Sequence, residues 1–429
     1  MFLIYVKTLT PRISYTFKHL LNSILGYEIQ FTSKIEEFIA HPGLKISYGK
    51  KKLGNEFFVQ QHDLLDQQGI QDIEINMGDW EGLPCFFKCT QDSDVPFDIF
   101  AASFFLLSRY EEYLPHVKDE LGRFPFQESL AFKEDFLELP VIDLWTLKFR
   151  DLLENRFEKK LPLQRTYQAS SIMVVQEVFK YKKKGIVRTL GALVRDIVKL
   201  QFKPSLERIK TLIFLQSDPY DIYDRLIERA RLHKMQWTFF FQLSDFSLQN
   251  KNISFHKLSY QALIKSMGDY GVLGLLPGFD ALDKLAILRK EKKRWENIVN
   301  TPLSRVLSFQ YGVNLPQFYN NLDKLEISQD FSMGYPKHPG FRAGTCTPFL
   351  YYDINFERIS PLTIHPYALS SLCFQEFSFF DIKVRIDNLN SKVREVNGKF
   401  LCLIENALLD PWDEQVKYLS LLEKLQTND

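Results

Sequence analysis

The pattern of apolar and polar residues changes once along the chain, and its first part predicts a mixed α/β domain. Residues 1–6 form an apolar run that predicts a first strand. Apolar positions at helical spacing then predict an amphipathic helix over residues 12–25, followed by a strand over residues 27–31. A second strong helix is predicted over residues 98–114. A charged helix over residues 144–160 is predicted to tether this domain to the next.

The second part of the chain repeats a longer unit of strand, loop and helix. This alternation is typical of a parallel sheet, and about 260 residues of it are the size of a (β/α) barrel, whose chemistry lies at the carboxyl ends of the strands. We therefore predict an N-terminal α/β domain over residues 1–163 and a distorted (β/α) barrel over residues 164–429. The predicted strands of the barrel are residues 171–175, 237–243, 271–276, 305–309, 349–352 and 400–404.

Composition excludes several classes of protein. The chain has 429 residues, of which 45% are apolar and 25% charged, so it can bury full cores and is not a disordered or fibrous chain. Its net charge of +1 provides no overall field that would draw it onto nucleic acid. No run of 18 apolar residues predicts a membrane-spanning helix. Five widely spaced cysteines, without a paired motif, favour reduced thiols and a cytoplasmic location.

Seven stretches of the chain carry a resemblance to a known family: residues 100–104, 108–114, 122–125, 128–132, 218–221, 333–335 and 340–345. The second part of the chain resembles the polysaccharide deacetylases (carbohydrate esterase family four). Nearly the whole chain resembles a two-domain Bacteroidetes-type branch in which such a barrel follows an N-terminal α/β domain. For the family, this resemblance implies metal-dependent removal of acetyl groups from N-acetylated sugars by an aspartate base, a metal held by an aspartate and two histidines, and a histidine acid.

The family's catalytic positions are degenerate in this chain. Where the resemblance implies the two aspartates of the first barrel strand, the chain has Val174 and Gln176. Leu276 and Phe309 stand at the histidine positions, and Glu405 replaces the acid histidine. We therefore predict no catalytic residues of the family type, no metal and no cofactor.

Three other side chains are candidates for ligand binding. Arg342 is kept within an intact Gly-Phe-Arg-Ala-Gly-Thr stretch, and Asp245 and Glu405 follow or end predicted strands. We expect Arg342 to be held by a carboxylate, with Asp245 as the first choice of partner. A carboxylate pair could also do acid and base work on glycosides without a metal. The plainer alternatives are a turn cap for Asp245, a salt bridge at the barrel rim for Glu405 and a solvated histidine for His338.

One segment is strongly basic. Residues 180–210 hold ten basic and two acidic side chains, a local net charge of +8. Apolar residues from Ile186 to Val198 follow helical spacing within it. A basic amphipathic helix of this kind is typical of contact with a membrane surface or an anionic glycolipid. The alternative, which we favour from the sequence, is a helix whose apolar face lies in the core and whose basic face is solvated.

These observations give one leading function and one alternative. The leading prediction is a catalytically inactive polysaccharide deacetylase homologue that retains a carbohydrate-binding or partner-binding cleft. The alternative is a metal-free carbohydrate hydrolase or deacetylase that uses Asp245 and Glu405. The predicted partners are a glycan or glycolipid, or an active enzyme of cell-envelope glycan metabolism, with peripheral membrane contact through Lys180 to Lys210 and no nucleic acid.

Overall fold

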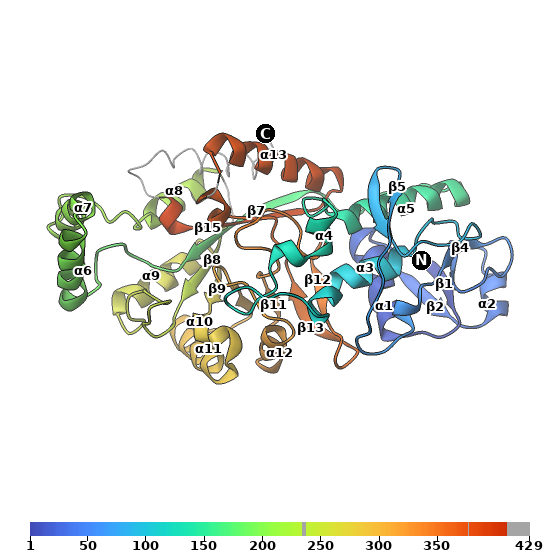
Figure 1. Cartoon of the computed structure of the whole chain (residues 1–429), viewed down its shortest axis with the longest axis horizontal. Coiled ribbons are helices and arrows are strands. Elements are labelled where there is room, and N and C mark those ends of the chain that lie inside the picture. Colours follow the sequence, from blue (N-terminus) through green and yellow to red (C-terminus); the bar gives the residue numbers. More distant parts are fainter. Residues whose placement is uncertain (234–236, 376, 410–429) are drawn as a thin grey trace. The chain divides into compact units, whose positions relative to one another are not determined.

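The computed structural model describes residues 1–233, 237–375 and 377–409, and its chain divides into two compact units (Figure 1). Unit 1 comprises Met1–Gln168 and Gly312–Phe400, and unit 2 comprises Ala169–Tyr311 and the segment that begins at Leu401. Residues 312–400, which the sequence assigned to the second domain, therefore belong to unit 1. The boundary between residues 163 and 164 stays a prediction. Both units are mixed α/β, as predicted, and no described helix is long and apolar enough to cross a membrane.

A parallel sheet of four strands forms the N-terminal part of unit 1, in the order β2-β1-β3-β4. Its strands are β1 (Phe2–Val6), β2 (Ile29–Thr32), β3 (Lys45–Gly49) and β4 (Phe57–Gln60). The connection from β1 to β2 is helical, and the one from β2 to β3 contains a short helix. These helices are α1 (Pro11–Phe17), which continues as the π-helical segment η1 (Lys18–Ile24), and α2 (Ile35–Ala40).

Helix α3 (Ile99–Leu107) lies at the centre of the unit 1 core, and all nine of its residues are buried. It begins where predicted because Asp98 caps it: the Asp98 carboxylate accepts hydrogen bonds from the backbone N–H groups of Phe100 and Ala101, each at 3.0 Å. The ring of Phe100 stacks on Phe17 of α1, with the centroids 3.6 Å apart. Burial of such rings supplies much of the stabilisation of this core.

The 312–400 segment adds three paired strands to unit 1. Strand β13 (Arg358–Ile364) pairs parallel with β11 (Gln329–Asp330) and antiparallel with β12 (Phe349–Asp353). The remaining elements of unit 1 are β5 (Met77–Trp80), β6 (Leu83–Phe86), α4 (Leu130–Lys133), α5 (Val141–Phe157), α12 (Gln317–Lys324), β14 (Leu369–Ser370) and α13 (Phe379–Glu395), with short 3₁₀ turns η2 (Asp63–Leu65), η3 (Tyr110–Tyr113), η4 (Phe126–Glu128) and η5 (Ser371–Gln375).

Five neighbouring strands run through unit 2 in the order β10-β9-β8-β7-β15. They are β7 (Gln168–Val175), β8 (Trp237–Gln242), β9 (Gly271–Leu276), β10 (Arg305–Val306) and β15 (Lys399–Glu405). The pairs of β7 with β8, β8 with β9 and β9 with β10 are parallel, as predicted. The closed barrel stays a prediction. The helices of unit 2 are α6 (Ile186–Val198), α7 (Phe202–Leu212), α8 (Tyr223–His233), α9 (Leu258–Gly268), α10 (Phe279–Asp283), α11 (Leu285–Val299) and η6 (Asn406–Leu409).

Two predictions about individual elements were wrong. Residues 349–352 form a strand, but its partner β13 is antiparallel, because only four residues connect the two strands and a parallel connection needs about a dozen. Residues 144–160 are not a tether: α5 carries buried side chains that include Trp145, Phe149 and Leu153, so it packs in the core of unit 1.

Candidate functional site

Arg342 is part of a buried ion-pair cluster in unit 1. Its Nε and Nη2 atoms donate to the two carboxylate oxygens of Glu112, at 2.9 and 2.7 Å, and both side chains are only 2% exposed. Arg109 donates from Nε to the same carboxylate at 2.7 Å and from Nη1 to the backbone carbonyl of Arg342. The expected carboxylate partner of Arg342 exists, but it is Glu112 and not Asp245.

The guanidinium groups of Arg342 and Arg109 stabilise the negative charge of Glu112 in this cluster. Burial alone would raise the pKa of Glu112, but the charges and hydrogen bonds of Arg342 and Arg109 lower it below its ordinary value. Arg109 also donates to the hydroxyl of Tyr335 at 3.1 Å. The cluster therefore joins the stretches 108–114, 333–335 and 340–345, and its role in unit 1 is to hold these segments together.

The loop around Arg342 depends on close packing. Gly344 has a φ of +66°, and a Cβ atom there would lie 2.9 Å from Cδ1 of Leu106, so a larger residue would be strained and crowded. His338 is half-buried and stacks on Phe126, with the ring centroids 4.2 Å apart. The sequence interpretation of His338 as a solvated side chain was therefore wrong, because an aromatic neighbour from a distant segment covers one face of its ring.

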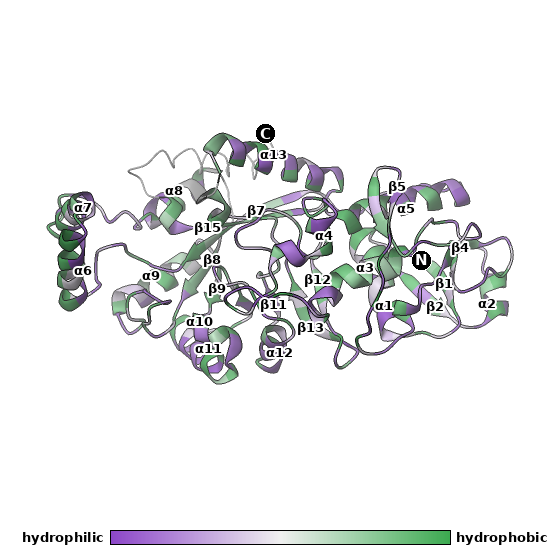
Figure 2. Cartoon of the chain, viewed as in Figure 1, coloured by the Kyte–Doolittle hydropathy of each residue, from purple (hydrophilic) through white to green (hydrophobic). Residues whose placement is uncertain are grey.

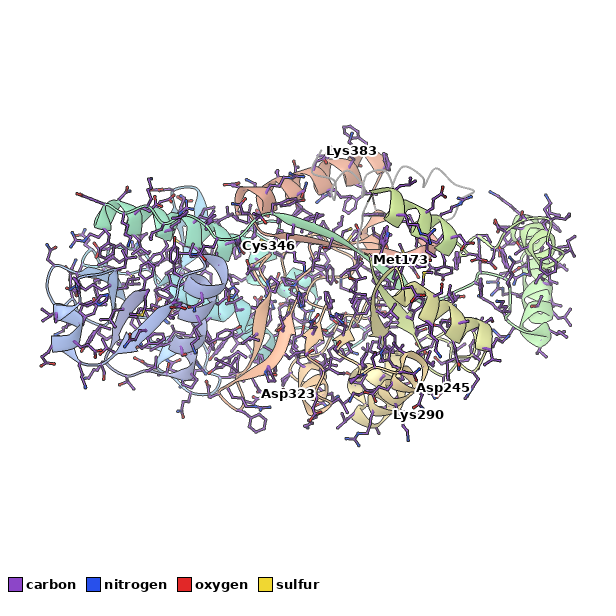
Figure 3. The ribbon with its side chains drawn as sticks, turned by 180° about the vertical axis from the view of Figure 1, so that it is seen from behind. Met173, Asp245, Lys290, Asp323, Cys346 and Lys383 are labelled. Atoms are coloured by element: carbon purple, nitrogen blue, oxygen red, sulfur yellow. The ribbon has the colours of Figure 1, made fainter. Side chains whose placement is uncertain are left out.

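Asp245 lies on the surface of unit 2, after β8. Its carboxylate accepts two hydrogen bonds from Nη2 of Arg294, at 2.8 and 2.7 Å, and one from Lys290 at 3.2 Å. Figure 3 labels Asp245 and Lys290, which lie near each other. The side chain is 64% exposed, and the hydrogen bond from Arg294 lowers its pKa. Asp245 is neither the partner of Arg342 nor a turn cap, because two basic side chains of α11 bind it as a surface ion pair.

Glu177 is an acidic side chain that interacts electrostatically with Glu405. Glu405 ends β15 and Glu177 follows the neighbouring strand β7, and the side chain of Asn406 donates to the backbone carbonyl of Glu177 at 2.9 Å. Burial and, as the smaller cause, the charge of Glu177 raise the pKa of Glu405 to about 7. Glu177 forms a salt bridge with Lys184. The sequence analysis missed Glu177, although its position just after the parallel strand β7 is a signal that could have identified it.

The degenerate family positions are mostly buried and apolar. Val174, Leu276 and Phe309 are at most 2% exposed, and the half-buried Gln176 donates from its side-chain amide to that of Gln310 at 3.2 Å. Buried apolar side chains offer no charge to a divalent ion and make its desolvation costly. Among the described residues, no group of three or more histidine, cysteine, aspartate or glutamate side chains could hold a metal ion.

A pocket of about 580 Å³ lies beside Glu177 in unit 2. It is lined by the loop after β7, by α6 and α7, and by the loop after β8. Arg188 donates to the carbonyls of Asn252 and Lys251, at 3.1 and 2.6 Å, so these bonds do not neutralise its charge. The charged side chains of the lining are three acidic ones, Glu177, Asp196 and Glu207, and six basic ones, Lys180, Lys184, Arg188, Arg195, Arg208 and Lys251.

Helices α6 and α7 form a hairpin that turns its polar face toward this pocket. Asp196 and Arg208 are buried and form an ion pair at 2.9 Å between the two helices. Glu207 of α7 accepts hydrogen bonds from Tyr181 at 2.5 Å and from Lys180 at 3.2 Å, in the loop after β7. These bonds attach the polar face of the hairpin to the rest of unit 2.

The opposite face of the hairpin is apolar and exposed (Figure 2). Val187 is 85% exposed, Ile186 79% and Val198 76%. The favoured sequence interpretation, with this face in the core, was wrong: the buried ion pair and the bonds of Glu207 fix the polar side inward, so the apolar side is left outward. We call the exposed side chains the apolar face; they are Ile186, Val187, Leu190, Val194, Ile197, Val198, Leu200, Phe202, Leu206, Ile209, Ile213, Phe214 and Leu215.

The titration of Glu405 gives a testable pH dependence. Its pKa is higher in the folded state than the value of about 4.3 in an unfolded chain. The folded state therefore binds more protons between these two values, and stability falls as the pH rises through that range. Glu405→Gln removes this loss, so the stability of the variant relative to the parent should rise by about 1–3 kcal/mol from pH 5 to pH 8. Urea unfolding of both proteins at pH 5, 6, 7 and 8 measures this.

The control for this experiment is Asp245→Asn. The exposed Asp245 has a lowered pKa, so its charge state does not change in this range. We expect the stability of this variant relative to the parent to stay constant between pH 5 and pH 8. A Glu405→Gln variant that behaves like this control would show that Glu405 titrates normally.

Comparisons with known proteins give one family match and several similar folds. Residues 2–158 match a family of unknown function, DUF7033. No curated protein matches the chain. Among solved structures, the chain is similar to a protein from Mycobacterium smegmatis assigned as a polysaccharide deacetylase, with 11% identity, a TM-score of 0.40 and coverage of 62% of this chain and 85% of that one.

Two further solved structures are similar at a lower level. A polysaccharide deacetylase from Bacillus cereus has 10% identity and a TM-score of 0.31, and the match covers 61% of this chain and 88% of that one. A mutant of a CE4 family pseudoenzyme with restored enzymatic activity has 9% identity and a TM-score of 0.28, with coverage of 60% and 66%. Similarity at this level does not assign an activity to the chain.

Proposed function

We propose that the protein is a catalytically inactive homologue of the polysaccharide deacetylases that binds the anionic head group of a glycolipid at a membrane surface. The observation that carries the proposal is the orientation of the α6–α7 hairpin, with its apolar face exposed and its polar face lining a basic pocket. The apolar face comprises thirteen exposed apolar side chains. A large exposed apolar patch marks an interaction site. A lipid bilayer accepts the apolar face, and the pocket accepts the charged head group.

Charge favours a membrane as the occupant of the apolar face. Lys199, Lys203 and Lys210 are exposed and lie on or beside the two helices that carry this face. Lysines beside an apolar helix face are attracted to anionic lipid head groups, at about 1 kcal/mol each near the surface. A second protein copy would present the same positive charges and would be repelled.

The pocket fits the chemistry of an anionic head group. Its volume of about 580 Å³ is in the range of small-ligand sites. Its lining has three more basic than acidic side chains, and both Arg188 of α6 and Lys251 of the loop after β8 belong to it. Guanidinium and ammonium groups bind phosphate and carboxylate oxygens through charge-assisted hydrogen bonds. A phosphate-bearing or acidic sugar is therefore the ligand class that we propose.

Sedimentation with lipid vesicles tests the proposal. We expect the protein to sediment with vesicles that contain phosphatidylglycerol and much less with vesicles of phosphatidylcholine alone. Binding should weaken as salt rises, because exposed charges are screened within about 8 Å at physiological ionic strength. If the protein stays in the supernatant with acidic vesicles at low salt, or forms dimers through this face instead, the proposed membrane contact is wrong.

The proposed lack of deacetylase activity predicts a separate result. We expect the purified protein to hold no stoichiometric zinc, nickel or cobalt, and to release no acetate from N-acetylated oligosaccharides. The reason is that Val174, Leu276 and Phe309 are buried apolar side chains where the family resemblance places metal ligands and the base. Metal analysis and an acetate assay measure this, and acetate release that a chelator abolishes would contradict it.

One observation favours a second function, a metal-free carbohydrate hydrolase. Glu405, with a pKa of about 7, is suited to act as a general acid, and Glu177, which forms a salt bridge with Lys184, to act as its partner carboxylate. Asp245, which the sequence suggested for this role, is not proposed for it, because Arg294 and Lys290 bind its carboxylate. Hydrolysis of nitrophenyl glycosides that Glu405→Gln and Glu177→Gln each abolish would favour the hydrolase over the binding protein.

A further inference from the structure

In the parallel sheet of unit 1, successive strands are placed first on one side of β1 and then on the other. The chain passes from β1 to β2 at one side and then returns to β3 at the other side of β1. The connections that follow β1 and β3 therefore leave in opposite directions. In open parallel sheets, this arrangement creates a crevice outside the carboxyl ends of the two strands, where ligands bind.

A pocket of about 640 Å³ lies at this position. Residues that directly follow the strands line it: Lys7 and Thr8 after β1, and Lys50 and Lys51 after β3. We call it the switch-point pocket. The rest of its lining comes from the strands and nearby loops and comprises Tyr5, Thr10, Ser47, Tyr48, Gly49, Leu53, Gln61 and Asp66.

The charges of the switch-point pocket favour an anion. Lys50 is already engaged, since it forms a salt bridge with Asp63 and donates to the backbone carbonyl of Gln61 at 3.0 Å. Lys7 and Lys51 are exposed, and neither forms a salt bridge with another described residue. The acidic side chain in the lining is Asp66, which accepts a hydrogen bond from Gln61 at 2.7 Å. With Lys50 paired to Asp63, the other charged side chains of the lining are the two lysines Lys7 and Lys51 and the one carboxylate of Asp66.

The backbone of β3 is open to a ligand at this edge. Gly49 ends the strand, and a Cβ atom added there would meet no atom within 4 Å. The absence of a side chain at Gly49 lets a ligand approach the backbone closely. The hydroxyl of Thr8, which is exposed beside Lys7, adds a neutral hydrogen-bonding group.

We propose that the switch-point pocket binds a small phosphate-bearing molecule, with Lys7 and Lys51 contacting the phosphate groups. The pocket has the size of small-molecule sites. The position at the topological switch point and the lysine lining are independent observations that favour the same class of ligand. The proposal does not depend on the function proposed for unit 2, since no residue is shared between the two pockets.

Isothermal titration of the full chain with inorganic pyrophosphate tests the proposal. We expect the Lys7→Ala, Lys51→Ala double variant to bind at least tenfold more weakly than the parent, because it loses two charge-assisted contacts. The matched control is Lys118→Ala, an exposed lysine of unit 1 outside the pocket, which should bind as the parent does. Gly49→Phe should also abolish binding, because its ring would occupy the pocket while the space around its Cβ lets the chain fold.

A third variant separates the two pockets. Arg188→Ala with Lys251→Ala alters the pocket of unit 2 and should leave the tightest pyrophosphate binding unchanged. Loss of that binding in this variant, with full binding in the Lys7→Ala, Lys51→Ala protein, would overturn the proposal and place the anion in unit 2. A parent protein that binds no pyrophosphate would also overturn it.

Discussion

Glu112→Gln is expected to lower the free energy of unfolding by about 3–5 kcal/mol, the usual cost of breaking a buried ion pair by removing one partner. The Glu112 carboxylate accepts hydrogen bonds from Arg342 and from Arg109, and all three side chains are at most 2% exposed. Without its charge, the two guanidinium groups would keep, of the salt bridges between described residues, only the one from Nη2 of Arg109 to the carboxylate of Glu111, at 2.7 Å. Urea unfolding of parent and variant at pH 7 measures this effect.

The matched control for this prediction is Asp245→Asn. Asp245 also binds arginine through both oxygens, but it lies on the surface, where ion pairs contribute about 0–1 kcal/mol. We expect this variant to unfold within about 1 kcal/mol of the parent. If the two variants lose similar small amounts, Glu112 is not the buried counter-ion of the cluster.

Replacing three apolar residues of the hairpin should abolish membrane contact without unfolding the protein. In the variant Leu190→Ser, Val194→Ser and Leu206→Ser, three exposed apolar side chains become polar. Each such side chain contributes about 1.5–3 kcal/mol when it is fully buried, and every 1.4 kcal/mol is a factor of about ten in affinity. Allowing for partial burial in the bilayer, we expect affinity for acidic vesicles to fall at least a hundredfold, as measured by sedimentation.

The stability of this variant distinguishes lipid contact from core packing. Because the three side chains are exposed, we expect the free energy of unfolding to stay within about 1 kcal/mol of the parent. Leu258→Ser in α9 is the control, since Leu258 is 80% exposed but lies outside the hairpin, and it should bind vesicles as the parent does. A variant that unfolds easily, or a control that loses vesicle binding equally, would contradict the assignment of the apolar face.

Local sequence patterns predicted most of the helices and strands, but they did not predict which face of the α6–α7 hairpin is exposed. Helical spacing in the segment from Ile186 to Val198 predicted α6, because periodicity depends only on neighbouring residues. Which face turns outward depends on the buried pair of Asp196 and Arg208 and on the bonds of Glu207 to the loop after β7. Strand β13 was missed because Pro361 interrupts its pattern at an irregularity in the pairing with β12.

The sequence could predict a residue of the candidate site only where its position at the end of a strand identifies it. Glu405 was identified because it ends β15, and Glu177 could have been identified by the same rule, since it follows β7. The partner of Arg342 could not be found in this way. Glu112 is 230 residues away in the sequence, and no local pattern connects the two. The stretches that resemble the deacetylase family included both residues but did not indicate that they pair.

The most direct test of the central claim is whether the apolar face enters the hydrocarbon of a bilayer. Leu206 is an exposed residue of α7 on this face, and Leu206→Trp places a fluorescent probe there. We expect the emission that this tryptophan adds to the parent spectrum to be quenched by acidic phospholipid vesicles with bromine atoms on their acyl chains. A protein that sediments with these vesicles while the added emission is unquenched would contradict the account.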